Sequence, residues 1–167
     1  MNVLLAVSGG IAAYKAADLA SQAIKAGYTV RVVMSPAACQ FIGPITFEAL
    51  TNHAVMVDMW ALGERDDSVS AIEHISWAKW ADVVVYAPLT ASTLAKLAHG
   101  IADNALTTVS LAIPPSVPQL ICPAMNTMMW EHPAVQRNLA ILESYDRYTI
   151  LNPIAKRLAC GDVGVGG

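Results

Sequence analysis

Charged residues are scarce in this sequence. Lysine, arginine, aspartate and glutamate make up 14% of the 167 residues, against about 25% in a typical soluble domain. The net charge is −3 and no basic residues cluster, which argues against a nucleic-acid-binding surface. No apolar run approaches the ~20 residues of a membrane-spanning helix. Because 55% of the chain is hydrophobic, we expect part of its surface to be buried against copies of the same chain.

Cysteine is scarce as well. Cys39, Cys122 and Cys160 form no C-x-x-C pair, so the sequence favours a reducing compartment over a disulfide framework. The four histidines are scattered and none stands at zinc-ligand spacing from a cysteine, so we expect no metal site. The apolar segment Met1–Val7 lacks a basic flank and a cleavage site, which predicts a first strand rather than a signal peptide. We therefore expect a cytoplasmic protein.

Five apolar segments are predicted to be β-strands, each ending in small or polar residues. They are Val3–Val7, Thr29–Met34, Val83–Ala87, Gln119–Cys122 and Tyr148–Asn152. Amphipathic helical patterns alternate with them, which predicts an α/β fold: a Rossmann-like or flavodoxin-like three-layer sandwich with a parallel sheet. At this length we expect one domain over residues 1–167. Residues 37–50 predict two short helices, and Ala54–Trp60 predicts a further strand.

Candidate ligand-binding residues follow the strand ends. These ends share one edge of a parallel sheet, where doubly wound folds bind ligands. Ser8-Gly9-Gly10 opens a helix and suits a phosphate, although a tight turn would use the same residues. Thr90, Ser92 and Thr93 lie at another predicted helix start, as caps or as phosphate ligands. The loop is not G-x-G-x-x-G, and Ser35 stands where an NAD site wants an acid, so a mononucleotide fits better.

Four further segments carry a resemblance to a known family. They are Glu73–Asp82 (EHISWAKWAD), Gly100–Thr107 (GIADNALT), Pro123–Trp130 (PAMNTMMW) and Arg157–Asp162 (RLACGD). With the glycine loop in front, the chain resembles the homo-oligomeric flavin-containing cysteine decarboxylases over essentially its whole length. The resemblance implies a Rossmann-like fold, FMN as cofactor, and trimers or multiples of trimers with FMN at the subunit interface. The family usually reads PASANT where this chain has residues 88–93 as PLTAST.

Within that family, the resemblance implies decarboxylation of 4′-phosphopantothenoyl-cysteine to 4′-phosphopantetheine in coenzyme A biosynthesis. Oxidation of the thiol places the carboxylate β to a C=S bond, which lets carbon dioxide leave, and the resulting enethiol is then reduced again. A redox cofactor is therefore needed for a carboxy-lyase reaction without net redox change. The enzyme that makes the substrate, a synthetase, is expected as a partner or as a fused domain.

The resemblance also implies roles for individual residues. His74 is expected to act as a base or orienting group near the thiol, Asn126 to bind the leaving carboxylate, and Cys160 to supply a proton in the final reduction. The expected cofactor-binding residues are Ser8, Gly9, Gly10, Ser35, Ala87, Thr90, Ser92, Thr93 and Met125. The expected substrate-binding residues are Asn126, Met129, Lys156 and Arg157. For the methionines, plain packing in the core is an equally common role.

Three other functions share this fold. A non-catalytic regulatory flavoprotein typically carries long acidic extensions, and none is present here. A peptidyl-cysteine decarboxylase stops at the enethiol and does not need the reducing cysteine, so Cys160 counts against it. A flavin prenyltransferase is disfavoured by the Pro123–Trp130 segment.

Overall fold

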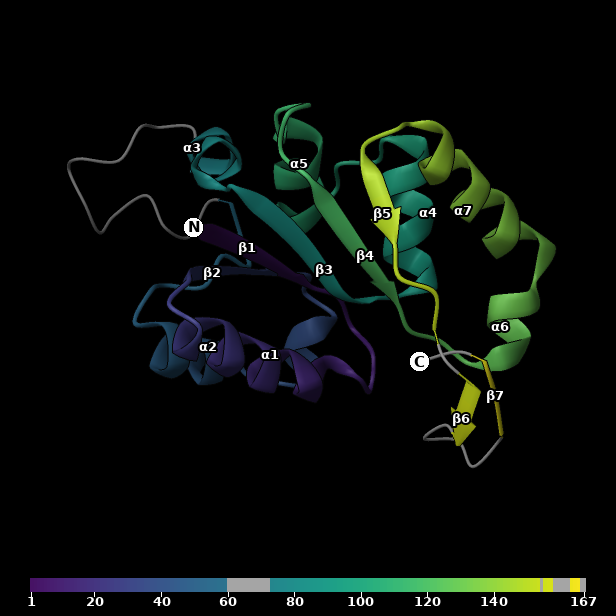
Figure 1. Cartoon of the computed structure of the whole chain (residues 1–167), viewed down its shortest axis with the longest axis horizontal. Helices are drawn as coiled ribbons and strands as arrows, with labels where there is room; N and C mark the ends of the chain where they lie inside the picture. The colour runs from purple at the N-terminus through teal and green to yellow at the C-terminus, as the bar shows by residue number, and fades with distance from the viewer. Residues whose placement is uncertain (60–72, 154, 158–162, 166–167) are drawn as a thin grey trace.

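The computed structural model describes residues 1–59, 73–153, 155–157 and 163–165. Five parallel strands form one sheet in the order β2-β1-β3-β4-β5 (Figure 1). Their bounds are β1 Asn2–Val7, β2 Thr29–Met34, β3 Val83–Leu89, β4 Gln119–Pro123 and β5 Tyr148–Ile150. All five predicted strands and the predicted α/β class are therefore confirmed.

Helices connect these strands. They are α1 Ala13–Lys25, α2 Pro44–Thr51, α3 Glu73–Trp80, α4 Ala91–His99, α5 Ala105–Ala112, α6 Thr127–Glu131 and α7 Pro133–Ser144. A short 3₁₀ helix, η1 (Ala38–Gln40), precedes α2, so two short helices lie within residues 37–51 as expected. None of the helices in the described part of the chain has both the length and the hydropathy to span a membrane.

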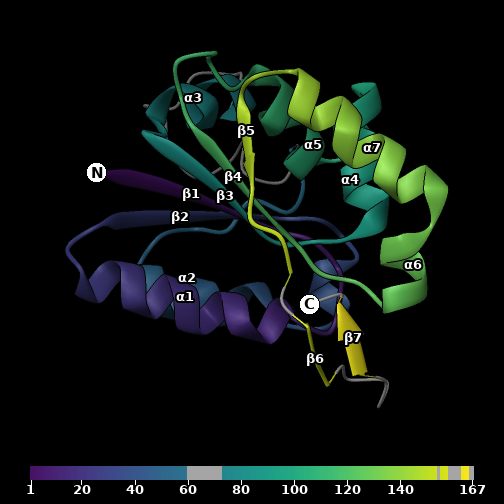
Figure 2. The ribbon, with the colours of Figure 1, turned by 45° about the vertical axis from the view of Figure 1, so that its right-hand side comes forward.

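Helices α1 and α2 cover one face of β1 and β2 (Figures 1 and 2). Alternate strand residues point to this face, because successive side chains of a strand lie on opposite sides of the sheet. They pack against three alanines of α1 and against Phe47 of α2. The members include Val3, Leu5, Val7, Val30, Val32, Met34, Ala13, Ala16 and Ala20. The small alanine side chains allow α1 to lie close to the sheet.

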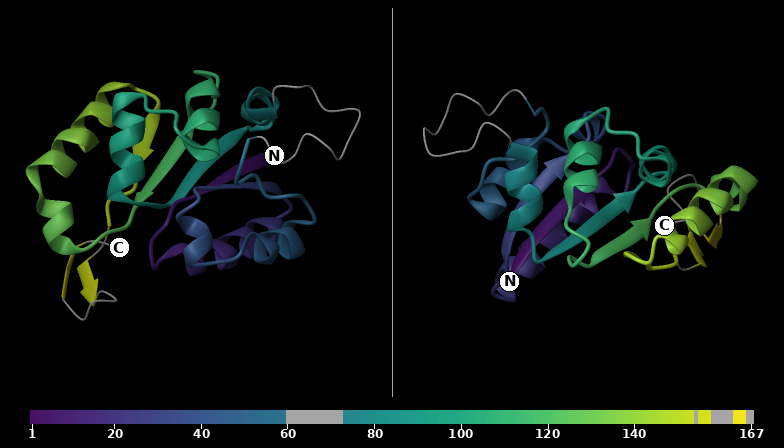
Figure 3. Two further views of the ribbon diagram at one scale, coloured as in Figure 1. Left: turned by 180° about the vertical axis from the view of Figure 1, so that it is seen from behind. Right: turned by 90° about the horizontal axis from the view of Figure 1, so that it is seen from above.

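Helices α3, α4, α5 and α7 cover the opposite face (Figures 1 and 3). Leu4 and Ala6 of β1, Tyr86 of β3 and Ile121 of β4 all point to this side and are buried. They pack against the apolar stripes of the four helices. The chief helical members are Trp77, Ala78, Leu94, Leu97, Leu106, Val109, Leu139 and Leu142.

The face of β3 and β4 on the side of α1 is less completely covered. Val85 and Leu120 are paired in register and point to this side, as does Cys122, two residues beyond Leu120. All three are only half-buried, although the corresponding residues of β1 are buried. Helices therefore cover both faces of the sheet at β1 and β2, but at β3 and β4 they cover fully only the face on the side of α4 and α5.

Two expectations about secondary structure were wrong or incomplete. The predicted strand Ala54–Trp60, of which Trp60 lies outside the described residues, is not formed over residues 54–59: Met56 makes an isolated bridge with Val33, and the chain bends at Val57. The sequence pattern also missed α6 and a two-stranded antiparallel pair, β6 (Ala155–Arg157) and β7 (Val163–Val165). These elements are too short for their periodicity to be detected.

The two phenylalanines of the chain test this description of the core. Phe47 is fully buried, whereas Phe41 is 50% exposed. We expect Phe47→Ala to lower the free energy of unfolding by about 3–5 kcal/mol. The matched Phe41→Ala should lower it by less than about 1 kcal/mol. Urea unfolding at one fixed protein concentration measures both, and equal losses for the two variants would contradict the assignment.

Candidate ligand-binding site

The candidate site lies where the strand order of the sheet reverses. The chain passes from β1 outward to β2, and then returns to β3 on the other side of β1. The connections after β1 and β3 therefore leave in opposite directions, and a crevice opens between them at the carboxyl edge. Three of the predicted segments, Ser8-Gly9-Gly10, Ser35 and residues 90–93, meet at this edge.

Ser8 ties the ends of β1 and β3 together. Its side chain is fully buried. Its Oγ donates a hydrogen bond to the Pro88 carbonyl at 2.6 Å and accepts one from the Thr90 backbone N–H at 2.8 Å. The backbone N–H of Ser8 also donates to the Pro88 carbonyl at 3.2 Å. The structure thus gives Ser8 a clear role in holding the loops, and its contact with the cofactor stays a prediction.

Gly9 makes a close approach to the loop after β2. A Cβ atom at Gly9 would lie 2.6 Å from both the carbonyl carbon and the Cβ of Ala37, closer than real side chains pack. A Cβ at Gly10 would lie 3.1 Å from the Thr90 methyl group. The glycines therefore allow the loops after β1, β2 and β3 to close around one space, which explains why this turn lacks side chains.

That space is a cavity of about 300 Å³, near the lower end of the size range of ligand pockets, about 300–1,000 Å³. Its lining residues are Gly9, Ser35, Pro36, Ala37, Thr90, Ser92, Thr93, Lys96, Asp103 and Asn104. They come from the loop before α1, the loop after β2, the first turns of α4 and the start of α5. Several helix N-termini therefore converge on it, and their partial positive charge favours an anionic ligand.

Hydroxyl groups supply most of the polar lining. Thr90 is the N-cap residue of α4, yet its side chain makes no capping hydrogen bond to the helix. Its hydroxyl lies 3.5 Å from that of Thr93. Helix capping therefore does not account for the Thr90 hydroxyl. Together with Ser35 and Ser92, these groups can donate to or accept from a polar ligand.

A charged pair in the lining was not predicted from the sequence. Lys96 Nζ lies 2.9 Å from Asp103 Oδ1 and 2.7 Å from Oδ2. The hydrogen bond from Lys96 is the main reason why the pKa of Asp103 is lowered from its ordinary value. Next to it, Asn104 forms a capping box with Thr107 that begins α5. Asp103 and Asn104 lie in the Gly100–Thr107 segment that the sequence singled out. The pairing of Asp103 with Lys96 could not be predicted, because it forms only when α4 and the start of α5 come together in the fold.

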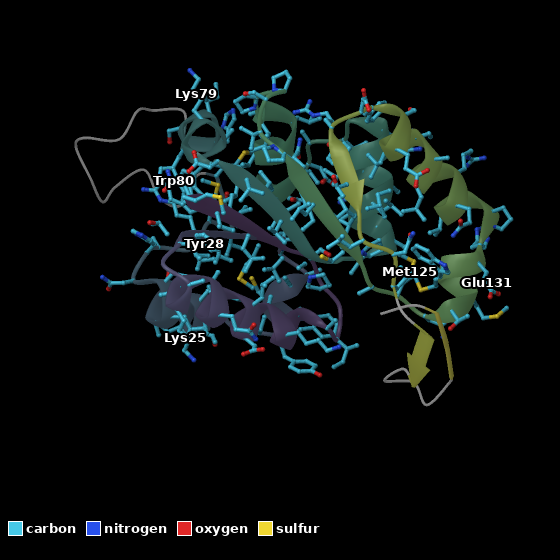
Figure 4. The ribbon with its side chains drawn as sticks, in the orientation of Figure 1. Lys25, Tyr28, Lys79, Trp80, Met125 and Glu131 are labelled. Carbon is cyan, nitrogen blue, oxygen red and sulfur yellow. The ribbon has the colours of Figure 1, made fainter. Side chains whose placement is uncertain are left out.

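Five of the nine expected cofactor-binding residues line the cavity: Gly9, Ser35, Thr90, Ser92 and Thr93. Gly10 lies beside Thr90. Ala87 is half-buried on the α1 side of β3 and lies outside the lining. Met125 follows β4 and packs against the core of the opposite face, below β5 in Figure 4.

Asn126 and Met129 lie at the same sheet edge, after β4. The Asn126 side-chain oxygen accepts from the Met128 N–H at 2.8 Å and caps α6. The Ala124 N–H donates to the Leu89 carbonyl at 3.0 Å, which holds this loop beside the end of β3. Met129 is 47% exposed, so core packing does not account for its position.

His74 lies away from the lining of this cavity. It stands in the first turn of α3, whose last residue, Trp80, accepts a hydrogen bond from Asn2 at the amino end of β1. The cavity lining of one chain therefore includes Gly9 and Thr90 but not His74. Lys156 and Arg157 lie on β6, with side chains outside the described residues, and Cys160 lies wholly outside them.

Two curated relatives match this chain closely in sequence. A probable phosphopantothenoylcysteine decarboxylase of Streptococcus mutans is 49% identical over 165 residues, covering 99% of this chain and 89% of the relative. The coenzyme A biosynthesis bifunctional protein CoaBC of Bacillus subtilis is 48% identical over 165 residues. The chain spans 39% of the length of that bifunctional relative.

Solved structures agree with the sequence matches. A PPC decarboxylase cysteine-to-serine mutant in complex with pantothenoylaminoethenethiol is 35% identical, with a TM-score of 0.85 over 99% of this chain and 89% of that one. The FMN-dependent cysteine decarboxylase SpaF is 34% identical, with a TM-score of 0.84 over all of this chain and 90% of that one.

The family pattern described as Flavoprotein matches residues 1–167. The shared fold, the sequence identities and this full-length match agree with one another. The chain belongs to the flavoprotein family.

Proposed function

We propose that this chain is an FMN-dependent carboxy-lyase that converts 4′-phosphopantothenoyl-cysteine to 4′-phosphopantetheine. The cavity at the switch point carries the proposal, because it combines a glycine loop, several helix starts and a group of hydroxyls in one site. Support comes from the 49% identity to a probable phosphopantothenoylcysteine decarboxylase. Further support comes from the PPC decarboxylase structure, which is in complex with pantothenoylaminoethenethiol.

The lining fits the phosphate and sugar-like chain of a mononucleotide. Gly9 lets the backbone approach closely, and the helix starts of α1 and α4 favour a phosphate group. Thr90, Ser92 and Thr93 provide hydroxyls, and Lys96 provides a positive charge. Bound FMN would supply the two-electron oxidation and reduction of the substrate. The residues of the chain would bind, orient and protonate.

Three residues are proposed to act on the substrate. Asn126, at the end of β4, would donate from its amide nitrogen to the leaving carboxylate. His74 would act as base or orienting group near the thiol. Cys160 would supply the proton that the enethiol needs when it is reduced. The cysteine-to-serine form of PPC decarboxylase, which binds an ethenethiol, supports a late role for a cysteine in this reaction.

We propose a trimer in which one protomer's α3 faces its partner's site, because His74 is not among the residues that line the cavity of its own chain. The half-covered face of β3 and β4, with Val85, Leu120 and Cys122, and the low charge content of 14% support an assembly. The trimer, the FMN at its interface and the cytoplasm stay predictions. A synthetase partner or fused domain is proposed because the B. subtilis relative is bifunctional.

An absorption spectrum and a carbon dioxide assay test the function. We expect the purified protein to carry flavin bands and to release carbon dioxide from 4′-phosphopantothenoyl-cysteine. A peptide with a C-terminal cysteine, the substrate of a peptidyl-cysteine decarboxylase, should react far more slowly. Protein that binds no FMN after reconstitution, or that prefers the peptide, would overturn the proposal.

Replacement of Gly9 tests the cofactor site. Gly9→Ala must push the loop of Ala37 away from the cavity, since a Cβ would lie 2.6 Å from that residue. Overpacking of this kind costs about 1–3 kcal/mol, so we expect FMN to bind about tenfold more weakly. Gly43→Ala is the control, because its Cβ would meet only the Ile45 side chain at 3.6 Å. Flavin fluorescence titration measures both, and unchanged affinity in Gly9→Ala would refute the site.

Replacement of His74 tests its role and its place in the assembly. We expect His74→Asn to keep bound FMN and to lose at least about a hundredfold in turnover, the scale of general acid–base catalysis. Mixed oligomers of His74→Asn with Gly9→Ala should regain activity, since one protomer's cavity would meet its partner's intact histidine. Undiminished turnover of His74→Asn would remove the histidine from the mechanism, and absence of complementation would place both groups in one chain's site.

Replacement of Cys160 separates carbon dioxide loss from the final reduction. We expect Cys160→Ser to release carbon dioxide in a first turnover and to yield the enethiol, which has two hydrogens fewer than 4′-phosphopantetheine. Mass spectrometry of the product distinguishes the two, and Cys39→Ser is the matched control. Full conversion to 4′-phosphopantetheine by Cys160→Ser would contradict the assigned role.

A further inference from the structure

Arg31 of β2 lies against two tryptophans of α3. The Cζ atom of its guanidinium is 4.6 Å from the centre of the Trp80 ring and 5.3 Å from the centre of the Trp77 ring. Both distances fall within about 6 Å, the range of cation–π contacts, and arginine also stacks on aromatic planes. One side chain of the sheet therefore contacts two residues that are three positions apart and lie on the same side of the helix.

The two tryptophans differ in environment. Trp77 is buried in the core between the sheet and the helices, whereas Trp80 is half-buried. Figure 4 shows Trp80 on the side of α3 that faces β1 and β2, with Lys79 on the outward side. Arg31 thus reaches α3 at the boundary between the core and solvent, where apolar packing alone leaves the last turn incompletely covered.

Arg31 is itself held firmly by the sheet. It pairs in register with Leu4 of β1, and its neighbours Val30 and Val32 are buried. Partial burial lowers the pKa of Arg31 from its ordinary value, but a guanidinium stays charged in proteins at neutral pH. The contact to the indole rings is therefore made by a cation whose backbone position is set by β2.

His74 shares a helical face with these tryptophans. Residues three and four apart lie on one side of a helix, so His74 stands one turn before Trp77 and Ala78. Trp77 and Ala78 are buried, His74 is half-buried, and Ile75 is exposed. Rotation of α3 about its axis would move His74 together with Trp77 and Trp80. A contact that fixes the two rings therefore also fixes the direction of the Cα–Cβ bond of His74, from which the imidazole extends.

We infer that Arg31 is a positioning residue for His74: its guanidinium, stacked on Trp77 and Trp80, sets the rotation of α3. This inference rests on the proposed role of His74 in the decarboxylation. Helix α3 has eight residues, which is too short for stability without tertiary contacts. The Arg31 contact links it directly to β2, at the opposite end of α3 from His74.

Arg31→Met tests the inference, because methionine keeps an unbranched apolar side chain and removes the planar cation. We expect kcat to fall about tenfold, since small displacements of catalytic groups have effects of this size. The KM and the FMN dissociation constant should change by less than about twofold, as expected when only transition-state interactions are lost. The NMR signal of the His74 imidazole should shift. Arg31→Lys keeps the charge but not the planar group, so its kcat should lie between those of the wild type and Arg31→Met.

Arg137→Met is the matched control, because Arg137 is exposed on α7; it should leave kcat and the His74 signal unchanged. If Arg31→Met does not fold, Trp80→Leu removes the nearer ring and should give the same fall in kcat. Unchanged kcat in the folded variants, or a loss of kcat without a shift of the His74 signal, would overturn the inference. A failure of the proposed function would differ, since the wild-type protein itself would then release no carbon dioxide from 4′-phosphopantothenoyl-cysteine. A failure of the role of His74 alone would appear as full turnover by His74→Asn.

Discussion

The structure depends on the close contact between the ends of β1 and β3. Ser8 Oγ bonds both the Pro88 carbonyl and the Thr90 N–H, so the two loops that leave in opposite directions stay joined at their base. A buried hydroxyl with two partners avoids the cost of leaving backbone groups unpaired at a strand end. The cavity and the helix starts around it keep their places because this joint is rigid.

Because the loops pack closely, backbone groups rather than large side chains surround the site. Gly9 meets Ala37 so tightly that a Cβ would not fit, and the backbone can therefore surround a ligand. Apolar strands then point the first turns of α1 and α4 to one place. Hydroxyls, the Lys96–Asp103 ion pair and Asn104 complete the lining. The local charge of the site comes largely from helix ends rather than from side chains, which suits a chain with 14% charged residues.

The asymmetry of the sheet bears on how the site is completed. One half is covered by α1 and α2, while Val85, Leu120 and Cys122 remain half-buried on the same side of the other half. His74 stands in the first turn of α3 and is not among the residues that line the cavity. The proposed second protomer would cover the half-buried side of β3 and β4 and would bring its histidine to this cavity.

The sequence alone was enough to predict the five strands of the parallel sheet, the main helices and the shared edge, because apolar runs and helical periodicity are local and the turns carry glycine and proline. Five of nine expected cofactor residues line the cavity for the same reason: parallel strand ends must meet at one edge. Only the tertiary structure decided that Lys96 meets Asp103, that Ser8 acts as a joint, and that Arg31 stacks on Trp77 and Trp80. These pairs are separated along the chain, and their contacts follow from how the layers pack, which no local pattern records.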